Sequence, residues 1–271
     1  MIFRQFSPEV VLKRSLEILD ENAANGFKTY ITGSIHHSGG FVDKAGKPDL
    51  YYTLFGVFLA EAFELRDVLK ATAEYVEHEI RNTEPVGVNL HCASILISKY
   101  SFDKKLKRDL QKKIRTNLDH GLIKQPVYGM FLTLLACYYS GDIMGLLKVR
   151  KHLHNLSGNE ILPSTVIAAM TVLQHIFGQP TADLINKLHD FYDSRGGFRA
   201  VKTAPVPDLL STAVTLYAYY FTQQDLRTIK PDCLSFIDSL HHEGGFGANI
   251  LDPEPDIEYT FYGMLALGSL A

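Results

Sequence analysis

The sequence has 271 residues, of which 46% are hydrophobic, so the chain can fill a sizeable core. Its formal net charge of −3 gives no reason to expect nucleic acid as a partner, because binding a phosphate backbone requires a basic face. No run reaches the roughly 18 apolar residues of a transmembrane segment, and charged residues interrupt residues 1–13, where a signal peptide would have its apolar core. Three cysteines lack the spacing of a disulfide framework or a zinc knuckle. These features predict a soluble protein of the reducing cytoplasm.

Apolar residues at helical spacing predict helices along the whole chain. The first helix is expected from the N-cap Ser7 to about Asn25, and residues 26–47 are expected to form a long loop. Six further helices are apolar on nearly every side, and each should start at a proline: Pro48, Pro85, Pro126, Pro163, Pro207 and Pro255. More polar helices are expected between them, over residues 66–82, 102–118, 142–156, 181–192 and 230–241. The pattern predicts twelve helices in six pairs, with no convincing strand.

One segment of the chain occurs three times, at residues 39–53, 196–212 and 244–260. Each copy begins with Gly-Gly-Phe and continues through a loop to Pro-Asp at the start of an apolar helix. The glycines permit positive φ, and the Asp carboxylate faces the positive end of the helix dipole. Repeated pairs of one buried and one exposed helix build either an open solenoid or a closed ring.

Two features favour the ring. The apolar helices carry little polar surface, as expected if one face packs on the outer helices and the other lines a central apolar cavity. The chain also remains apolar up to Ala271, whereas an open solenoid requires polar caps at its ends. We therefore expect one all-α domain over residues 1–271, with the two ends of the chain in contact.

These repeats resemble the family of protein prenyltransferase β-subunits and of terpene and squalene cyclases. The most specific part is residues 39–53, which are similar to the family's pattern of Gly-Gly-Phe, a basic loop, an Asp and a residue pair at the mouth of an inner helix. The resemblance covers essentially the whole chain. It implies an α6/α6 toroid, a double barrel of six inner and six outer helices around an apolar cavity. It does not select a reaction, because the family includes transferases, cyclases and members of unknown activity.

The resemblance implies a diphosphate site in the first copy. The family uses two basic residues three positions apart after Gly-Gly-Phe and a tyrosine just inside the helix, and Lys44, Lys47 and Tyr52 occupy those positions. Two ammonium groups, a phenol donor and a helix N-terminus suit a diphosphate. The second copy has only Arg199 and Lys202, at different offsets, and the third has no base. The alternative is that both lysines are ordinary solvated loop residues.

Zinc is a second implication of the resemblance. Protein prenyltransferases hold it with Asp-x-Cys on one inner helix and His on the next; Asp49 and His91 match, but Tyr51 replaces the thiolate. Asp49, His91 and Cys92 could still hold Zn²⁺, and Mg²⁺ stays open as the other cofactor. Alternatively, Asp49 is a helix-start carboxylate, His91 a polar lining residue, and no metal is bound. Without an activating metal a thiol acceptor lacks its usual route to thiolate, which argues against protein cysteine prenylation.

Aromatic side chains on the inner helices have faces that suit an isoprenoid chain and a developing carbocation. We expect substrate contacts from Tyr51, Phe55, Tyr128, Tyr259 and Tyr262, within a larger aromatic set that includes Tyr52, Phe58, Phe131, Tyr217 and Phe261. A twelve-helix ring also needs aromatic filler, so at least half of the set should be core.

Two other patterns have less specific explanations. The pairs His36-His37 and His241-His242 could hold a metal across a closed ring, but a place at a helix C-terminus, favoured by the helix dipole, explains them better. The acidic residues of 252–256 do not form the clustered Asp-x-Asp-Asp by which some cyclases protonate an olefin.

The sequence therefore predicts a prenyltransferase-like protein that binds an isoprenoid diphosphate and transfers the prenyl group to a small acceptor. Asp49, Tyr52 and His91 are its expected catalytic residues. A terpene cyclase on the same scaffold is the alternative enzyme. A catalytically silent toroid that binds a hydrophobic small molecule or a partner is the alternative from another class. Whether a second subunit completes the site stays open.

Overall fold

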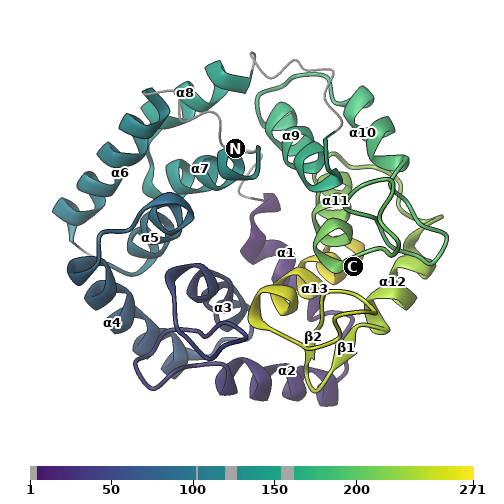
Figure 1. The fold of residues 1–271 in the computed structure, drawn as a ribbon, viewed down its shortest axis with the longest axis horizontal. Coiled ribbons are helices and arrows are strands. Elements are labelled where there is room, and N and C mark those ends of the chain that lie inside the picture. Colours follow the sequence, from purple (N-terminus) through teal and green to yellow (C-terminus); the bar gives the residue numbers. More distant parts are fainter. Residues whose placement is uncertain (1–4, 102, 120–126, 154–161) are drawn as a thin grey trace. The chain divides into compact units, whose positions relative to one another are not determined.

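Figure 1 shows the computed structural model, which describes residues 5–101, 103–119, 127–153 and 162–271. Within these residues the chain is predominantly helical, with thirteen α-helices and two short strands. The first seven helices are α1 (Pro8–Ser15), α2 (Glu21–Gly33), α3 (Leu50–Ala62), α4 (Arg66–Asn82), α5 (Gly87–Tyr100), α6 (Lys104–Asp119) and α7 (Val127–Ser140). The others are α8 (Ile143–Leu153), α9 (Ser164–Ile176), α10 (Ala182–His189), α11 (Leu209–Phe221), α12 (Lys230–Asp238) and α13 (Ile257–Leu270). The predicted all-α class is confirmed.

The beginning of the chain differs from the prediction. Instead of one helix to about Asn25 followed by a loop, α1 ends at Ser15 and α2 runs from Glu21 to Gly33. The break arises because the Asp20 carboxylate accepts a hydrogen bond from the Ala23 N–H at 2.8 Å and so caps a new helix. The described chain therefore has α1 ahead of six helix pairs, and the predicted total of twelve helices is wrong by one.

The apolar helices begin one or two residues after the prolines rather than at them. Behind Pro48, Pro207 and Pro255 the next residue, an Asp, is the one that caps the helix. Its carboxylate accepts the N–H of the third residue along, from Asp49 to Tyr52 at 2.7 Å, from Asp208 to Ser211 at 2.8 Å and from Asp256 to Tyr259 at 2.7 Å. Pro126 lies outside the described residues.

The structure contains a short β-hairpin that the sequence pattern did not predict. β1 (His241–His242) pairs antiparallel with β2 (Gly245–Phe246), and Glu243 and Gly244 between them have φ of 50° and 81°. Two positive φ angles in a two-residue loop give the type I′ turn that suits twisted strands. The prediction that the histidine pairs end helices is wrong, because His241 and His242 lie in β1, and His36 and His37 follow α2 by more than one residue.

The three Gly-Gly-Phe turns have the same local geometry. The first glycine has φ between 81° and 99°, and a Cβ atom there would lie 2.1–2.6 Å from a backbone oxygen of an outer helix. A Cβ on the second glycine would lie 2.6–2.8 Å from an aromatic ring one turn further along that helix. The helix positions are Ala71 and Tyr75 for Gly39 and Gly40, Asp232 and Phe236 for Gly196 and Gly197, and Gly26 and Tyr30 for Gly244 and Gly245. Only glycine permits this approach.

The first two turns pack on the next outer helix along the chain, and the third turn packs on α2. The first turn contacts α4, and the second contacts α12. The third turn, which precedes the last inner helix α13, contacts α2, the outer helix of the first pair. The last repeat therefore docks on the first, as a closed repeat requires and an open solenoid does not.

The chain divides into two compact units: the first contains Met1–Ser34, Phe55–Arg66 and Ile161–Ala271, and the second Ile35–Leu54 and Asp67–Glu160. In the first unit α13 packs against both α1 and α11 (Figure 1). The rings of Phe55 on α3 and Phe261 on α13 lie 5.0 Å apart, so the first and last inner helices are in contact, as predicted. Arg14 on α1 donates hydrogen bonds to the backbone oxygens of Gly268 and Ala271.

In the second unit α5 packs against α6 and α7, and α6 packs against α8. None of the helices in the described ranges has the length and apolar composition needed to span a membrane. The single domain expected from the sequence stays a prediction.

Candidate functional site

The loop that carries Lys44 and Lys47 is held in shape by hydrogen bonds to the side chain and backbone of Asp43. Asp43 Oδ1 accepts the N–H groups of Ala45 and Lys47, each at 2.9 Å, and the Asp43 N–H donates to the Lys47 oxygen at 3.0 Å. Gly46, with φ of 77°, closes the turn by donating to the Asp43 oxygen at 2.9 Å. Both lysines are exposed on this tight loop, three and six positions before the first residue of α3.

Asp49 follows the loop and caps α3 through the Tyr52 N–H. Burial raises the pKa of the Asp49 carboxyl, and the backbone N–H groups of Tyr52 and Tyr51 and the nearby Lys47 ammonium offset only part of that rise. The half-buried rings of Tyr51 and Tyr52 meet edge to face, with centroids 5.6 Å apart. Asp49 and both tyrosines thus share the first turn of α3, and the Lys47 ammonium lies near the Asp49 carboxyl.

Asp49 and Tyr51 also line a cleft of about 350 Å³ together with Val86, Val88 and Asn89 at the start of α5. The two valines are 72% and 41% exposed, which is unusual for aliphatic side chains at a helix start. The sequence pattern did not indicate them, because α5 has no Gly-Gly-Phe turn before it. Two valines on either side of a glycine in a connecting segment are the signal that could have indicated them.

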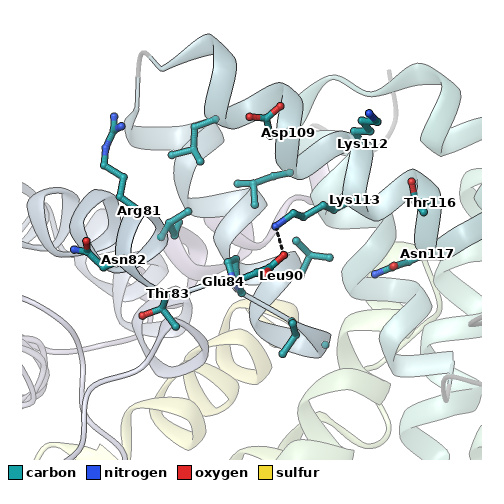
Figure 2. Close-up of a pocket in the computed structure, with 16 residues that line it drawn as sticks. Arg81, Asn82, Thr83, Glu84, Leu90, Asp109, Lys112, Lys113, Thr116 and Asn117 are labelled. Atoms are coloured by element: carbon teal, nitrogen blue, oxygen red, sulfur yellow. Dashed lines mark hydrogen bonds and ion pairs between the residues drawn. The ribbon is translucent and has the colours of Figure 1, made fainter.

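A larger groove of about 1130 Å³ lies beside this cleft and shares Val86 with it. It runs between the segment that joins α4 to α5 and the helix α6 (Figure 2). Lys113 on α6 points across it to Glu84, with Nζ 2.7 Å from Oε1, and this hydrogen bond lowers the pKa of Glu84. Lys112, Thr116 and other polar residues complete the wall. The sequence pattern of residues 102–118 predicted a polar helix and did not indicate the groove.

His91 lies inside α5 and is 4% exposed. Its Nδ1 is 3.0 Å from the Gly87 oxygen, and its Nε2 is 2.9 Å from Thr133 Oγ1. Because the carbonyl can only accept, these partners assign the proton to Nδ1 and make Nε2 an acceptor for the hydroxyl. Burial lowers the pKa of His91. The ring is therefore neutral, with both nitrogens engaged.

A family model described as the prenyltransferase alpha-alpha toroid domain matches residues 11–86 and 161–270, well over half of the chain. The chain belongs to this family. Its fold class is thus the all-α toroid predicted from the repeats. The matched segments contain all three Gly-Gly-Phe turns, whereas residues 87–160 lie outside them. Comparisons with curated proteins and with solved structures found no match.

The metal that some toroid prenyltransferases use does not fit the residues of this toroid. In the part of the chain that the structure describes, no three His, Cys, Asp or Glu side chains are placed to hold a metal ion. Asp49 caps α3, both nitrogens of His91 are engaged, and Cys92 is 0% exposed. These donors suit neither Zn²⁺ nor Mg²⁺, and no step below depends on a metal.

Several aromatic residues expected to line the toroid cavity pack on one another. Phe55, Phe261 and Tyr262 are 3–5% exposed, and their ring centroids lie 5.0–5.6 Å apart. Tyr259 is only half-buried, and burial raises its pKa to about 12. The Tyr128 side chain lies outside the described part of the structure. Phe55 and Tyr262 thus contribute to the core of the first unit.

The acidic residues of the third copy do not share a site. Asp256 is 6% exposed and caps α13, whereas Asp252 and Glu254 are exposed to solvent. The arrangement does not resemble a carboxyl kept neutral by neighbouring carboxylates.

Proposed function

We propose that this toroid binds an isoprenoid diphosphate at the start of α3 and transfers the prenyl group to a small acceptor. Family membership supports the class of ligand. The observation that carries the proposal is the exposed pair Lys44 and Lys47 on a self-closed loop, directly before a helix N-terminus and Tyr52. Ammonium groups, a phenol and backbone N–H groups are the donors that a diphosphate requires.

The other two Gly-Gly-Phe turns support this choice by contrast. In the second turn Arg195 and Arg199 both bind the Asp193 carboxylate, and Lys202 binds Asp190 at 2.7 Å. The third turn has no Lys or Arg between residues 244 and 256. In the first turn the Asp43 carboxylate accepts the N–H groups of Ala45 and Lys47. Of the three turns, the first carries two exposed lysines three positions apart.

The proposed reaction is a substitution at C1 of the prenyl group. The bond from C1 to the diphosphate oxygen breaks, and both electrons leave with the diphosphate, whose growing charge Lys44, Lys47 and Tyr52 stabilise. A nucleophile of the acceptor forms the new bond to C1. Asp49, which lines the adjacent cleft, takes the proton that the nucleophile loses. His91 positions the first turn of α5 through Gly87 and does not touch the reacting atoms.

The catalytically silent toroid is a second candidate, and one observation favours it. The aromatic side chains of Phe55, Phe261 and Tyr262 fill space with one another. A toroid of this kind would bind a hydrophobic molecule or a partner without turnover.

Pyrophosphate release tests the proposal. The protein is incubated with farnesyl or geranylgeranyl diphosphate and a panel of small thiol, amine and phenol acceptors. Release that depends on an acceptor supports the transferase. A cyclised product that retains its diphosphate indicates a cyclase that starts by protonation, and binding without turnover indicates the silent toroid; either result refutes prenyl transfer.

A further inference from the structure

Helix α8 displays a row of aliphatic side chains to solvent. Ile143, Met144 and Leu147 are 71%, 56% and 53% exposed, and their spacing places them on one face of the helix. The opposite face is packed: Val149 is 0% exposed, and a Cβ on Gly145 would lie 2.5 Å from Cys137 Sγ. The orientation of α8 is therefore set by its packing, which directs the aliphatic row outward.

Exposed basic side chains lie on the same helix as this aliphatic row and on the helix that contacts it. On α8 itself Arg150 and Lys151 are exposed, and on the neighbouring helix α6 the exposed bases are Lys104, Lys105, Arg108 and Lys112. Helix α6 has seven Lys or Arg residues and two Asp, and α8 has three Lys or Arg and no acid. Since the whole chain has a net charge of −3, positive charge is concentrated on these two helices and the rest of the chain is acidic.

The two helices are fixed to each other. Arg115 on α6 donates from Nε to Asp142 Oδ2 at 2.7 Å, and the Asp142 carboxyl, 3% exposed, also accepts the Gly145 N–H at 3.0 Å. Asp142 thus caps α8 and ties its first turn to α6. Figure 1 shows α6 and α8 as neighbours within the second unit. We call their outward surface the basic–apolar face; it consists of Lys104, Lys105, Arg108, Lys112, Ile143, Met144, Leu147, Arg150 and Lys151.

We propose that the basic–apolar face docks the protein on an anionic lipid surface. Exposed aliphatic side chains enter the boundary between headgroups and acyl chains, and flanking Lys and Arg bind lipid phosphates and carboxylates. The groove of Figure 2 lies along α6 and includes no residue of α8. Each side chain of the aliphatic row is more than half exposed, so the row projects from the helix into solvent. A projecting aliphatic row between bases matches a flat, deformable anionic surface better than the pocket of a protein partner. This inference does not depend on prenyl transfer.

Sedimentation with vesicles tests the inference. We expect the protein to sediment with vesicles of phosphatidylcholine mixed with phosphatidylserine, and far less with phosphatidylcholine alone. Added salt should weaken the binding, because it screens the lysine and arginine charges. Equal binding to both kinds of vesicle, or to neither, overturns the inference.

Two double variants separate the contribution of the aliphatic row from that of the basic side chains. Met144→Ser with Leu147→Ser removes exposed apolar surface, and Lys105→Glu with Lys112→Glu reverses two charges; each should weaken vesicle binding at least tenfold. The matched control is Ile250→Ser with Leu251→Ser, which removes aliphatic side chains that are 54% and 72% exposed but lie beside Asp252 rather than beside bases. Its vesicle binding should be unchanged. An unchanged thermal midpoint in all variants shows that the fold is intact.

The same variants distinguish an acidic protein partner. If the parent does not bind vesicles but binds polyglutamate, and the aliphatic and charge variants both lose that binding, the face belongs to an acidic polypeptide and the lipid proposal is wrong. If the control variant loses vesicle binding as much as the Met144 and Leu147 variant, exposed apolar surface in general causes binding, and the proposal is also wrong.

Discussion

The Gly-Gly-Phe repeats and residues 87–160 both contain paired helices, but the turns that join the helices differ. Each copy of the repeat has a glycine pair because the backbone of the turn nearly touches the backbone of an outer helix there, and each copy also has a phenylalanine and an Asp helix cap. The turn between α4 and α5 has no glycine pair, and residues 87–160 lie outside the family match. The glycine pair thus recurs where backbones nearly touch, whereas residues 87–160 include a basic helix and an exposed aliphatic row.

The largest effect should come from the first glycine of a repeat. In Gly196→Ala the new Cβ would lie 2.1 Å from the Asp232 oxygen, at φ of 99°, so the free energy of unfolding should fall by about 3 kcal/mol or more. Gly178 is the control, because its φ is 68° but a Cβ there would meet nothing within 4 Å. Gly178→Ala should cost only about 1 to 2 kcal/mol. Equal losses in urea unfolding would contradict the contact argument.

The lysine pair should distinguish the first repeat from the second. Lys44→Ala with Lys47→Ala removes two charge-assisted contacts, each worth about 1.5 to 3 kcal/mol, so affinity for farnesyl diphosphate should fall about a hundredfold or more. Lys202→Ala, at a lysine of the second turn that binds Asp190, should leave the affinity unchanged. Both variants should unfold within about 0.5 kcal/mol of the parent. Titration calorimetry decides the matter, and an unchanged affinity in the double variant refutes the site.

A smaller effect is expected from the threonine that each repeat places behind its phenylalanine. Thr53 Oγ1 accepts the buried Phe41 N–H at 3.1 Å, so Thr53→Val should cost about 1 to 2 kcal/mol of unfolding free energy. Thr212 and Thr260 make the same contact and should behave alike. The control is Thr171, whose hydroxyl only donates to the Ile167 oxygen within α9. If Thr171→Val costs as much as Thr53→Val, the shared contact is not what stabilises the repeats.

The smallest effect should come from the Asp193 carboxyl when the pH is lowered. Hydrogen bonds from Arg195 first, and from Arg199, hold the pKa of Asp193 well below its usual range. A carboxyl with a lowered folded-state pKa stabilises the fold above its unfolded pKa of about 3.9, and this contribution is lost as the pH falls further. Between about pH 6 and pH 3 the Tm of the parent should therefore drop by about 2 to 4 °C more than that of Asp193→Asn. Parallel Tm curves for the two proteins would show that Asp193 does not contribute.

The fold was more predictable than the site. The pairing of helices, the contact between the first and last inner helices and the family follow from periodicity and from the repeated turn, which are local patterns. The break between α1 and α2 was missed because apolar spacing continues through it, and Gly26 marks a contact with Gly244 rather than the end of a helix. Such a contact depends on residues far apart in the sequence, which no local pattern shows.

The candidate site was predicted where one segment carries it and missed where two segments build it. Lys44, Lys47, Asp49 and Tyr52 belong to a single copy of the repeat and could be selected by position. The role of His91 depends on Thr133, 42 residues away, and this contact engages a nitrogen that spacing alone made available to a metal. Val86 and Val88 become notable only because the packing of α5 leaves them exposed beside Asp49.

The contact between α1 and α13 has a consequence for biosynthesis. Arg14 and Gly268 are 254 positions apart, so a ribosome must deliver almost every later helix before α1 can meet the surface that buries Val11 and Leu12. Until then these apolar side chains stay open to water or to a chaperone, and contacts this distant in sequence form slowly. Burial of α1 is thus controlled by the arrival of α13, which is synthesised long after α1.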